Sequence, residues 1–387
     1  MRRENSVRSS AEWRAWTWPS LLTTARIRQK VPLLALPDGF WLYRAALASR
    51  AQGNDMTVEI IQANALALPL PDASVDLIVT SPPYFGLRSY QDGGKHYEGQ
   101  LGDEPTPAEF VDALIAATRE MMRVVKPTGS IWLNLGDKYA TAGTRQGNGD
   151  GIGDYDSDRT QSARHYMPKP AGIPTKSLIG VPWRYALRCI DDLGLILRAE
   201  VIWSKPNGLP ESVTDRVRRS HETWFHFTLQ PRYFSGVDEI REPHADLTLH
   251  AATRRARTDS RLADHGQTST ANPLGKLPGS VWTIPTQPLI VPDELGIDHF
   301  AAFPMEWPRR IISGWCPDGG TVLDPFGGTG TTALVAHALD RHGISVDLSS
   351  DYCRLARWRT TDPAQIAKAA EQPKPQPIPD GQMELKL

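Results

Sequence analysis

A short polar segment after a predicted buried strand could hold a planar ring that carries an exocyclic amine. The apolar run 75–79 predicts the strand, and one threonine separates it from Ser81, Pro82, Pro83 and Tyr84. Two consecutive prolines remove two backbone donors and fix φ, so the strand ends in a rigid loop with outward carbonyls. The Ser81 hydroxyl and a proline carbonyl can accept the two N–H hydrogens of an amine while Tyr84 stacks on the ring. For this segment alone, a Pro-Pro turn with a core tyrosine is the favoured, simpler interpretation.

A second stretch combines a carboxylate with closely spaced glycines. A β-branched strand runs into Asp324, Pro325, Phe326, Gly327, Gly328, Thr329, Gly330 and Thr331, and a helix is predicted over 332–339. Glycines let a ligand approach the backbone closely, and the N-terminus of the helix offers free N–H donors. The next predicted strand, 343–346, ends in Asp347, where an acid can accept hydrogen bonds from both hydroxyls of a ribose.

The charge of this stretch separates two possible cofactors. Gly328, Gly330 and Ala333 fit the dinucleotide pattern G-x-G-x-x-G/A, but only about 55 residues follow, too few for the usual dinucleotide arrangement. Asp324 would repel a pyrophosphate and attract a cationic ligand. S-Adenosyl-L-methionine carries an ammonium and a sulfonium but no phosphate, so the charges favour it over NAD.

The periodicity of the chain predicts an α/β fold with a mainly parallel sheet. Strands are expected over 57–63, 75–79, 130–135, 195–203 and 224–229, and helices over 107–126 and 182–193. We expect five parts: a poorly ordered extension (1–55), a catalytic part (56–235), a target-recognition insert (236–278), a cofactor-binding part (279–360) and a disordered tail (361–387). Met56 directly precedes the first strand, and we expect the functional protein to start there.

The overall composition says little about partners. The 43 Lys and Arg residues balance 44 Asp and Glu residues, so a nucleic-acid surface would have to be local. Two clusters could contact phosphates, or equally form a solvated surface: Arg216, Arg218 and Arg219, and Arg254, Arg255 and Arg257. Three widely spaced cysteines predict neither a disulfide framework nor a metal site and suit a reducing cytoplasm. No apolar run approaches the length of a membrane span.

Taken together, four ordered motifs resemble the β group of DNA amino-methyltransferases, which methylate cytosine N4 or adenine N6. In that group the catalytic motif comes first and the cofactor motif last, as 81–84 and 324–330 do here. Residues 203–208 match a further family stretch. A fourth motif resembles the family's segment that closes over the methionine end of the cofactor. Its residues here include Ser280, Trp282, Phe303 and Pro304.

The resemblance covers roughly 57–359 and implies both a fold and a mechanism. The fold is a permuted Rossmann-like one with a mostly parallel, seven-stranded sheet, and Asn64 lies near the adenine. The mechanism is direct methyl transfer from S-adenosyl-L-methionine to a base flipped out of double-stranded DNA. In relatives, serine before Pro-Pro-Tyr is associated with cytosine N4 and aspartate with adenine N6, so Ser81 favours cytosine N4 and leaves adenine N6 open. A cognate restriction nuclease is a possible partner, although an orphan or phage-borne enzyme is equally compatible.

Three other functions compete with this hypothesis. An NAD-dependent Rossmann oxidoreductase would retain NAD rather than S-adenosyl-L-methionine. A DNA-binding module without catalysis would require a broken active segment, yet both 81–84 and 324–330 are intact. Methylation of RNA or of protein amides would more usually show asparagine before Pro-Pro-Tyr.

Overall fold

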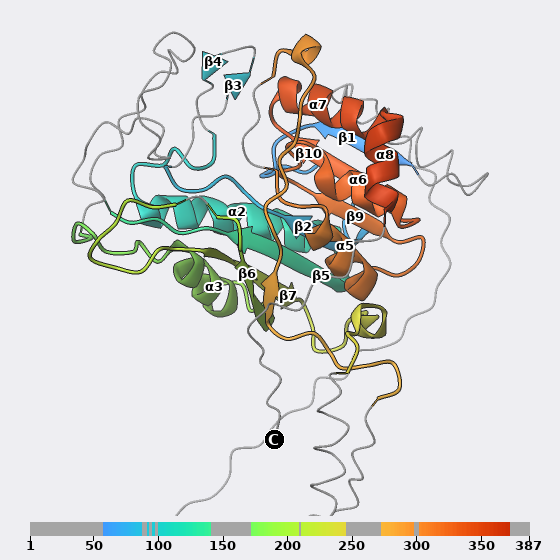
Figure 1. The fold of residues 1–387 in the computed structure, drawn as a ribbon, viewed down its shortest axis with the longest axis horizontal. Coiled ribbons are helices and arrows are strands. Elements are labelled where there is room, and N and C mark those ends of the chain that lie inside the picture. The colour runs from blue at the N-terminus through green and yellow to red at the C-terminus, as the bar shows by residue number, and fades with distance from the viewer. Residues whose placement is uncertain are drawn as a thin grey trace, which may run out of the picture.

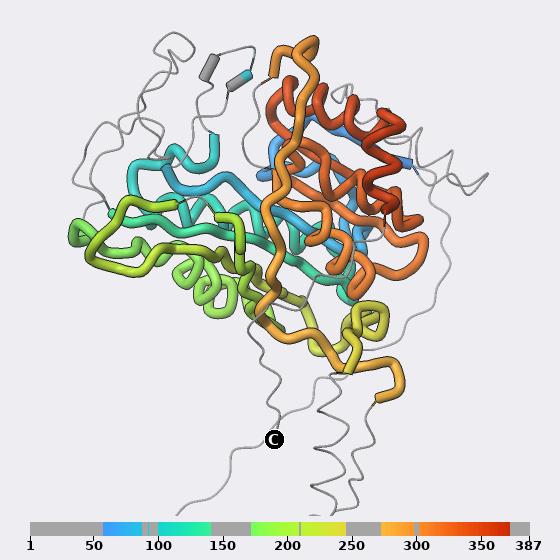
Figure 2. Tube along the Cα trace, viewed as in Figure 1, coloured from blue at the N-terminus to red at the C-terminus, as the bar shows by residue number. Residues whose placement is uncertain are grey.

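The central element of the protein is a twisted sheet (Figures 1 and 2). This computed structural model describes residues 57–86, 91–92, 95–96, 100–140, 172–208, 210–244, 272–297 and 302–371. Within them eight strands are ordered β1 (Val58–Gln62), β10 (His342–Asp347), β9 (Thr321–Asp324), β2 (Val75–Thr80), β5 (Val125–Leu135), β7 (His221–Thr228), β6 (Ile196–Ser204) and β8 (Val281–Thr283). Only β7 runs antiparallel to its neighbours β5 and β6.

This topology confirms the α/β class and corrects the strand count. Seven strands were expected, but the three-residue β8 adds an eighth beside β6 at the edge of the sheet. Strand β9, which leads into the glycine loop (residues 325–330), pairs with β2, although β2 lies more than 200 residues earlier in the chain. The carboxyl ends of β2, β9 and β10 therefore meet at one edge, which is where ligands bind in open α/β sheets.

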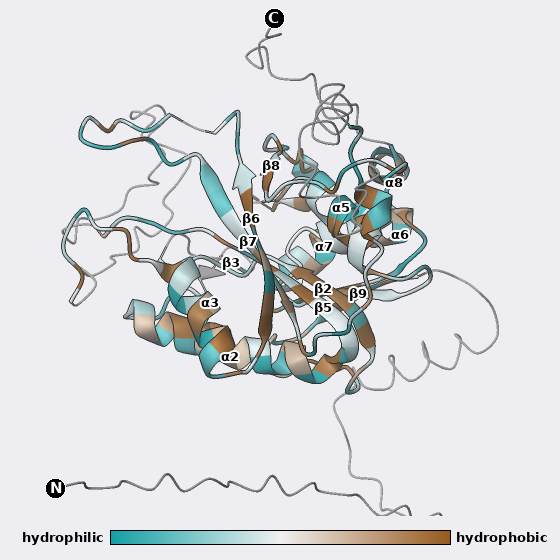
Figure 3. Cartoon of the chain, turned by 90° about the horizontal axis from the view of Figure 1, so that it is seen from below, coloured by the Kyte–Doolittle hydropathy of each residue, from teal (hydrophilic) through white to brown (hydrophobic). Residues whose placement is uncertain are grey.

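Helices cover both faces of the sheet (Figure 3). One face carries α2 (Pro107–Val124) and α3 (Val181–Asp191), and the other carries α5 (Glu306–Trp315), α6 (Thr331–Ala338), α7 (Ser350–Thr361) and α8 (Pro363–Ala370). Short 3₁₀ turns, η1 (Val237–Ile240) and η3 (Asp293–Leu295), and a small hairpin of β3 (Gln91–Asp92) and β4 (Lys95–His96) lie in the connections. Among the described residues no helix is long and apolar enough to cross a membrane.

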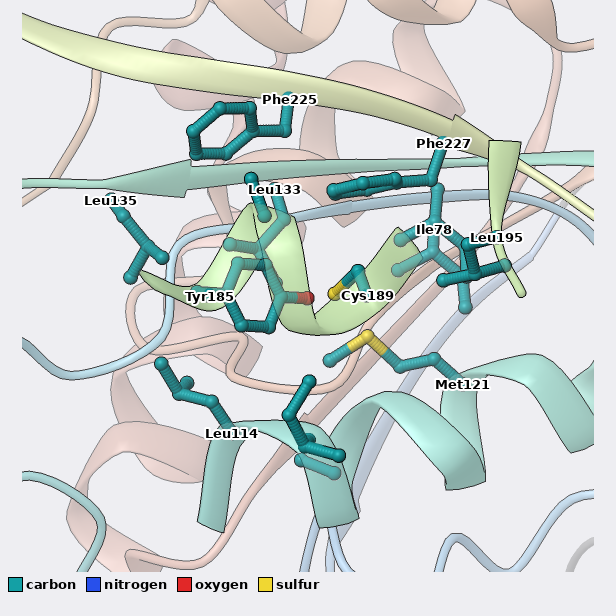
Figure 4. Close-up of a cluster of buried hydrophobic side chains, with 14 of the residues drawn as sticks. Ile78, Leu114, Met121, Leu133, Leu135, Tyr185, Cys189, Leu195, Phe225 and Phe227 are labelled. Carbon is teal, nitrogen blue, oxygen red and sulfur yellow. The ribbon is translucent and has the colours of Figure 1, made fainter. Parts of the chain in front are cut away.

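The two faces bury different kinds of side chain. Between the sheet and α2 and α3 the core is mainly aliphatic, and Ile78, Leu114, Met121 and Tyr185 belong to one buried cluster (Figure 4). Helix α2 begins with a reciprocal capping box between Thr106 and Glu109. The opposite face is filled by indole rings, in a cluster that contains Trp132, Trp203, Trp224, Trp282, Trp307 and Trp315.

The predicted tail is wrong for residues 363–370, which form α8 rather than disordered chain. Asp362 caps this helix by accepting from the Gln365 N–H at 2.9 Å, and Ala369 is fully buried against the rest of the fold. Of the predicted insert, the described ends are joined by an isolated bridge between Glu242 and Lys276. The expected extension (1–55) and residues 245–271 of the expected insert lie outside the described residues.

Candidate active site

The segment predicted to hold the amine leaves β2 at the carboxyl edge of the sheet. Ser81 and Pro83 are half-buried and Pro82 is buried. The loop before α2 supports this segment, because a side chain at Gly102 would come within 3.0 Å of the Tyr84 carbonyl oxygen. Gly102 has φ +104°, a conformation that favours glycine, and its carbonyl accepts from the Gly86 N–H at 2.8 Å.

Three strands fix the ring of Tyr84. Its hydroxyl lies 2.7 Å from the Asn134 Oδ1 on β5 and 2.8 Å from the Glu222 Oε2 on β7. Lys205 at the end of β6 forms an ion pair with Glu222, and its ammonium lies 4.1 Å from the centroid of the Trp203 ring. Sequence reasoning missed Asn134 and Glu222; the only local signal for Asn134 is a polar residue inside the apolar run 131–135.

The tyrosine hydroxyl can serve both neighbours only if one of them donates to it. A hydroxyl carries a single hydrogen, whereas the Asn134 Oδ1 and the Glu222 Oε2 are both acceptor oxygens. If the Asn134 amide is turned by 180°, its NH₂ group donates to Tyr84, and Tyr84 in turn donates to the Glu222 carboxylate. That assignment also gives the Asn134 Nδ2 a hydrogen-bond partner. In the unturned orientation this buried atom has no partner among the described residues.

A cavity opens between this segment and the glycine loop. Its walls come from the ends of β1, β2, β9 and β10, from the loop before α2 and from the segment before α5. The residues that line it include Asn64, Ser81, Pro83, Glu104, Phe303, Pro325, Phe326, Gly327, Gly328, Thr329, Thr331, Asp347, Leu348 and Tyr352. The structure therefore brings two of the predicted catalytic residues and most of the predicted cofactor residues to one cavity.

The glycine loop is packed too closely for side chains at two of its positions. A Cβ at Gly327 would overlap the Ser345 hydroxyl on β10, and a Cβ at Gly330 would lie 2.9 Å from the Cβ of Ala356 on α7. Gly330 also has φ +71° as the residue before α6. The glycines therefore allow the loop to approach the neighbouring strand and helix, as well as a ligand.

Asp324 does not lie where the charge argument expected it. Its side chain is buried beneath the loop and is not among the cavity walls. Thr80 and Thr332 each donate a hydroxyl hydrogen to its carboxylate, at 2.7 and 2.8 Å. Burial raises the pKa of Asp324 to about 6 despite these hydrogen bonds. Asp324 thus ties β2 to the glycine loop rather than facing a ligand.

Asp347 lines the cavity, and its contact with a ribose stays a prediction. Its two carboxylate oxygens accept from the Gly328 N–H and the Ser349 N–H, both at 2.9 Å, and burial raises its pKa to about 6. Asn64 lines the same cavity, but its Oδ1 already accepts from the Leu66 N–H at 2.9 Å.

The predicted closing segment is only partly at the cavity. Phe303 lines it and packs edge-to-face on Trp224. Ser280 and Trp282 lie at β8 on the far edge of the sheet, where Trp282 stacks on Trp307 at 4.9 Å. Pro304 is buried outside the cavity walls. The resemblance placed these residues by order along the chain, whereas the position of β8 in the sheet separates them from the cofactor strands.

The first arginine cluster lies in the β6–β7 connection, which begins at Lys205, the ion-pair partner of Glu222. The guanidinium of Arg216 pairs with Glu211 at 2.7 Å, and Arg218 donates to the Gly208 carbonyl at 2.8 Å. Arg219 lies 3.7 Å from the buried carboxylate of Asp137. These contacts order the connection, and phosphate contact stays a prediction. Arg254, Arg255 and Arg257 lie outside the described residues.

The sheet and its helices define an α/β protein with a Rossmann-like fold, and comparison with known proteins identifies its family. The chain belongs to the DNA methylase family of N6 and N4 amino-methyltransferases, whose sequence model matches residues 75–357. This family uses S-adenosyl-L-methionine, and its substrate is DNA.

Two relatives and one solved structure show how close the similarity is. The type II methyltransferase M.SmaI of Serratia marcescens is 36% identical over 284 residues, covering 73% of this chain and 83% of that protein. M.XycI of Xanthomonas campestris pv. cyanopsidis is 37% identical over 291 residues, covering 75% and 82%. The PvuII DNA methyltransferase (cytosine-N4-specific) superposes with a TM-score of 0.52 and 21% identity, covering 81% and 90%, which shows the fold.

Proposed function

We propose that this protein methylates cytosine N4 in double-stranded DNA, with S-adenosyl-L-methionine as the methyl donor. The observation that carries the proposal is the shared cavity. Ser81 and Pro83 line the same space as the glycine loop and Asp347, although the two motifs are more than 240 residues apart. The cytosine specificity rests on serine at position 81 and agrees with the name of the PvuII enzyme.

The glycine loop suits a ligand without a pyrophosphate. The N–H of Gly327 donates to the Val346 carbonyl at 2.8 Å, and that of Gly330 donates to the Gly327 carbonyl at 2.8 Å. The N–H of Gly328 donates to Asp347. Because all three glycine donors are already used within the protein, they cannot cradle phosphate oxygens as a dinucleotide loop does. This disfavours the NAD-dependent oxidoreductase.

The charges lining the cavity suit a cation. Among the described residues, the carboxylates of Asp347 and Glu104 line it and no lysine or arginine side chain does. Burial raises the pKa of both carboxyls, so a bound cation would stabilise their ionised forms. Asp347 would hold the ribose hydroxyls, with Leu348 and Tyr352 as apolar walls beside it. When bound, the cofactor supplies a methyl group activated by a sulfonium.

The residues around Ser81 would act on the amine and the ring of the base. Ring conjugation makes an exocyclic amine a weak nucleophile, so its two N–H hydrogens need acceptors that hold it in a reactive orientation. The Ser81 hydroxyl and the Pro82 carbonyl would provide these acceptors. The Tyr84 ring, fixed by its hydroxyl, would stack on the flipped base.

The test is to methylate DNA with the purified protein, digest it, and resolve the nucleosides by mass spectrometry. N4-methylcytosine is expected. N6-methyladenine would keep the family and the cavity assignment but refute the base assignment. A wild-type protein that binds the cofactor and yields neither product would refute the proposal. Tyr84→Ala serves as the control, because it should bind the cofactor as the wild type does and give much less product. A partner nuclease stays a prediction.

A further inference from the structure

A buried arginine lies behind the glycine loop, outside both sequence motifs. Arg359 lies on α7, which packs beside α6 and β10 (Figure 1). Its side chain is only 3% exposed, and Nη1 donates to the hydroxyls of Thr329 and Thr331, both at 2.7 Å. Within the described part of the chain, no carboxylate forms an ion pair with it, and its Nε has no hydrogen-bond partner.

A cation buried in this way is costly unless something offsets its charge. Removing a guanidinium from water without a counter-ion carries a large desolvation penalty. Burial lowers the pKa of Arg359 to about 10, so the group still carries its charge at neutral pH. Its immediate partners are neutral hydroxyls. An anion bound in the neighbouring cavity would offset the charge that the folded protein leaves unpaired.

The two threonines can transmit this charge to the cavity. Both line it, and their hydroxyl oxygens lie 3.0 Å apart. Each oxygen already accepts from Arg359, and one hydroxyl hydrogen is used between the two threonines. The second hydrogen remains for an acceptor in the cavity. Thr331 is also the first residue of α6, so the positive end of that helix adds to the potential.

We propose that Arg359 is a positioning residue for the carboxylate of the cofactor's methionine part, acting through Thr329 and Thr331. The inference rests on the proposed use of S-adenosyl-L-methionine. It also divides the cavity by charge. Arg359 lies behind the threonines, whereas the carboxylates of Glu104 and Asp347 line the cavity itself. A zwitterionic amino-acid group presents both signs of charge and matches this division.

The test compares the binding affinities of two ligands and does not depend on catalysis. S-Adenosyl-L-methionine and its decarboxylated analogue share the adenosine, sulfonium and ammonium, and differ in the carboxylate. We expect the full-length wild type to bind the first more tightly in calorimetric titrations. Arg359→Met should weaken that binding about 10- to 100-fold, the range for a hydrogen bond to a charged group, and leave the analogue's affinity unchanged or improved.

The controls separate charge from folding. Arg357 is exposed on the same helix, so Arg357→Met should leave both affinities unchanged. If Arg359→Met does not fold, Thr331→Val tests the same path and should show the same selective loss. Equal weakening of both ligands in either variant would show a structural role and refute the inference. Equal affinity of the wild type for both ligands, with methylation intact, would refute the inference but not the function. A wild type that binds neither would refute both.

Discussion

Replacing Gly136 with alanine should slow methylation without weakening cofactor binding. A Cβ at Gly136 would lie 2.5 Å from Cε2 and 2.8 Å from Cδ2 of the Tyr84 ring. Ordinary carbon contacts are about 3.5–4.0 Å, so the ring must move by about 1 Å. Such a shift breaks the alignment of the Tyr84 hydroxyl with Asn134 and Glu222. A misplacement of about 1 Å can cost about 100-fold in rate.

The assay compares turnover on DNA with the dissociation constant of S-adenosyl-L-methionine. We expect kcat to fall about 100-fold. The dissociation constant should stay unchanged, because Tyr84 is not among the cavity walls. Gly279→Ala is the matched control, since a Cβ there would meet no atom within 4 Å.

A double variant decides whether the effect passes through the tyrosine. In a Tyr84→Ala background the ring is absent, so Gly136→Ala should reduce turnover no further. An equal fold-reduction in both backgrounds would refute the reasoning, because it would mean that alanine disturbs the strand end rather than the ring. Unchanged turnover in the single variant would refute it as well.

Two further predictions concern the glycine loop and its buried carboxylate. Gly327→Ala should abolish cofactor binding because its Cβ overlaps the Ser345 hydroxyl; adding Ser345→Ala should restore part of the affinity measured by calorimetry, and no rescue would contradict the packing argument. The pKa of Asp324 is raised from 3.8 to about 6 when folded, so the unfolded chain ionises first and stability is lost as the pH rises through about 6. The contribution of Asp324 to the free energy of unfolding should fall by up to about 3 kcal/mol between pH 4 and 7. In urea titrations Asp324→Asn should remove this share of the decrease and leave the share of Asp347, whose pKa is also raised to about 6. An unchanged pH profile in that variant would show that Asp324 is not responsible.

Local sequence patterns predicted much of the fold. The two prolines that end β2 act through their own backbone chemistry, and the helix over 107–126 follows from its apolar period, so both are visible in a few consecutive residues. The short β8 and the helix α8 were missed. A three-residue strand has too little periodicity to detect, and α8 is stabilised mainly by packing against α6 and α7.

The amino-acid sequence by itself determined the chemistry that this protein carries: the Ser-Pro-Pro-Tyr segment, the glycine loop and the acid after the next strand. Their residue types and local backbone restrictions are properties of short segments. The tertiary structure decided which of them meet. It turned Asp324 away from the cavity, placed Glu222 at Tyr84 across 138 residues, and put Arg359 behind the threonines. These contacts depend on strand order and helix packing, which bring together residues that no local pattern relates.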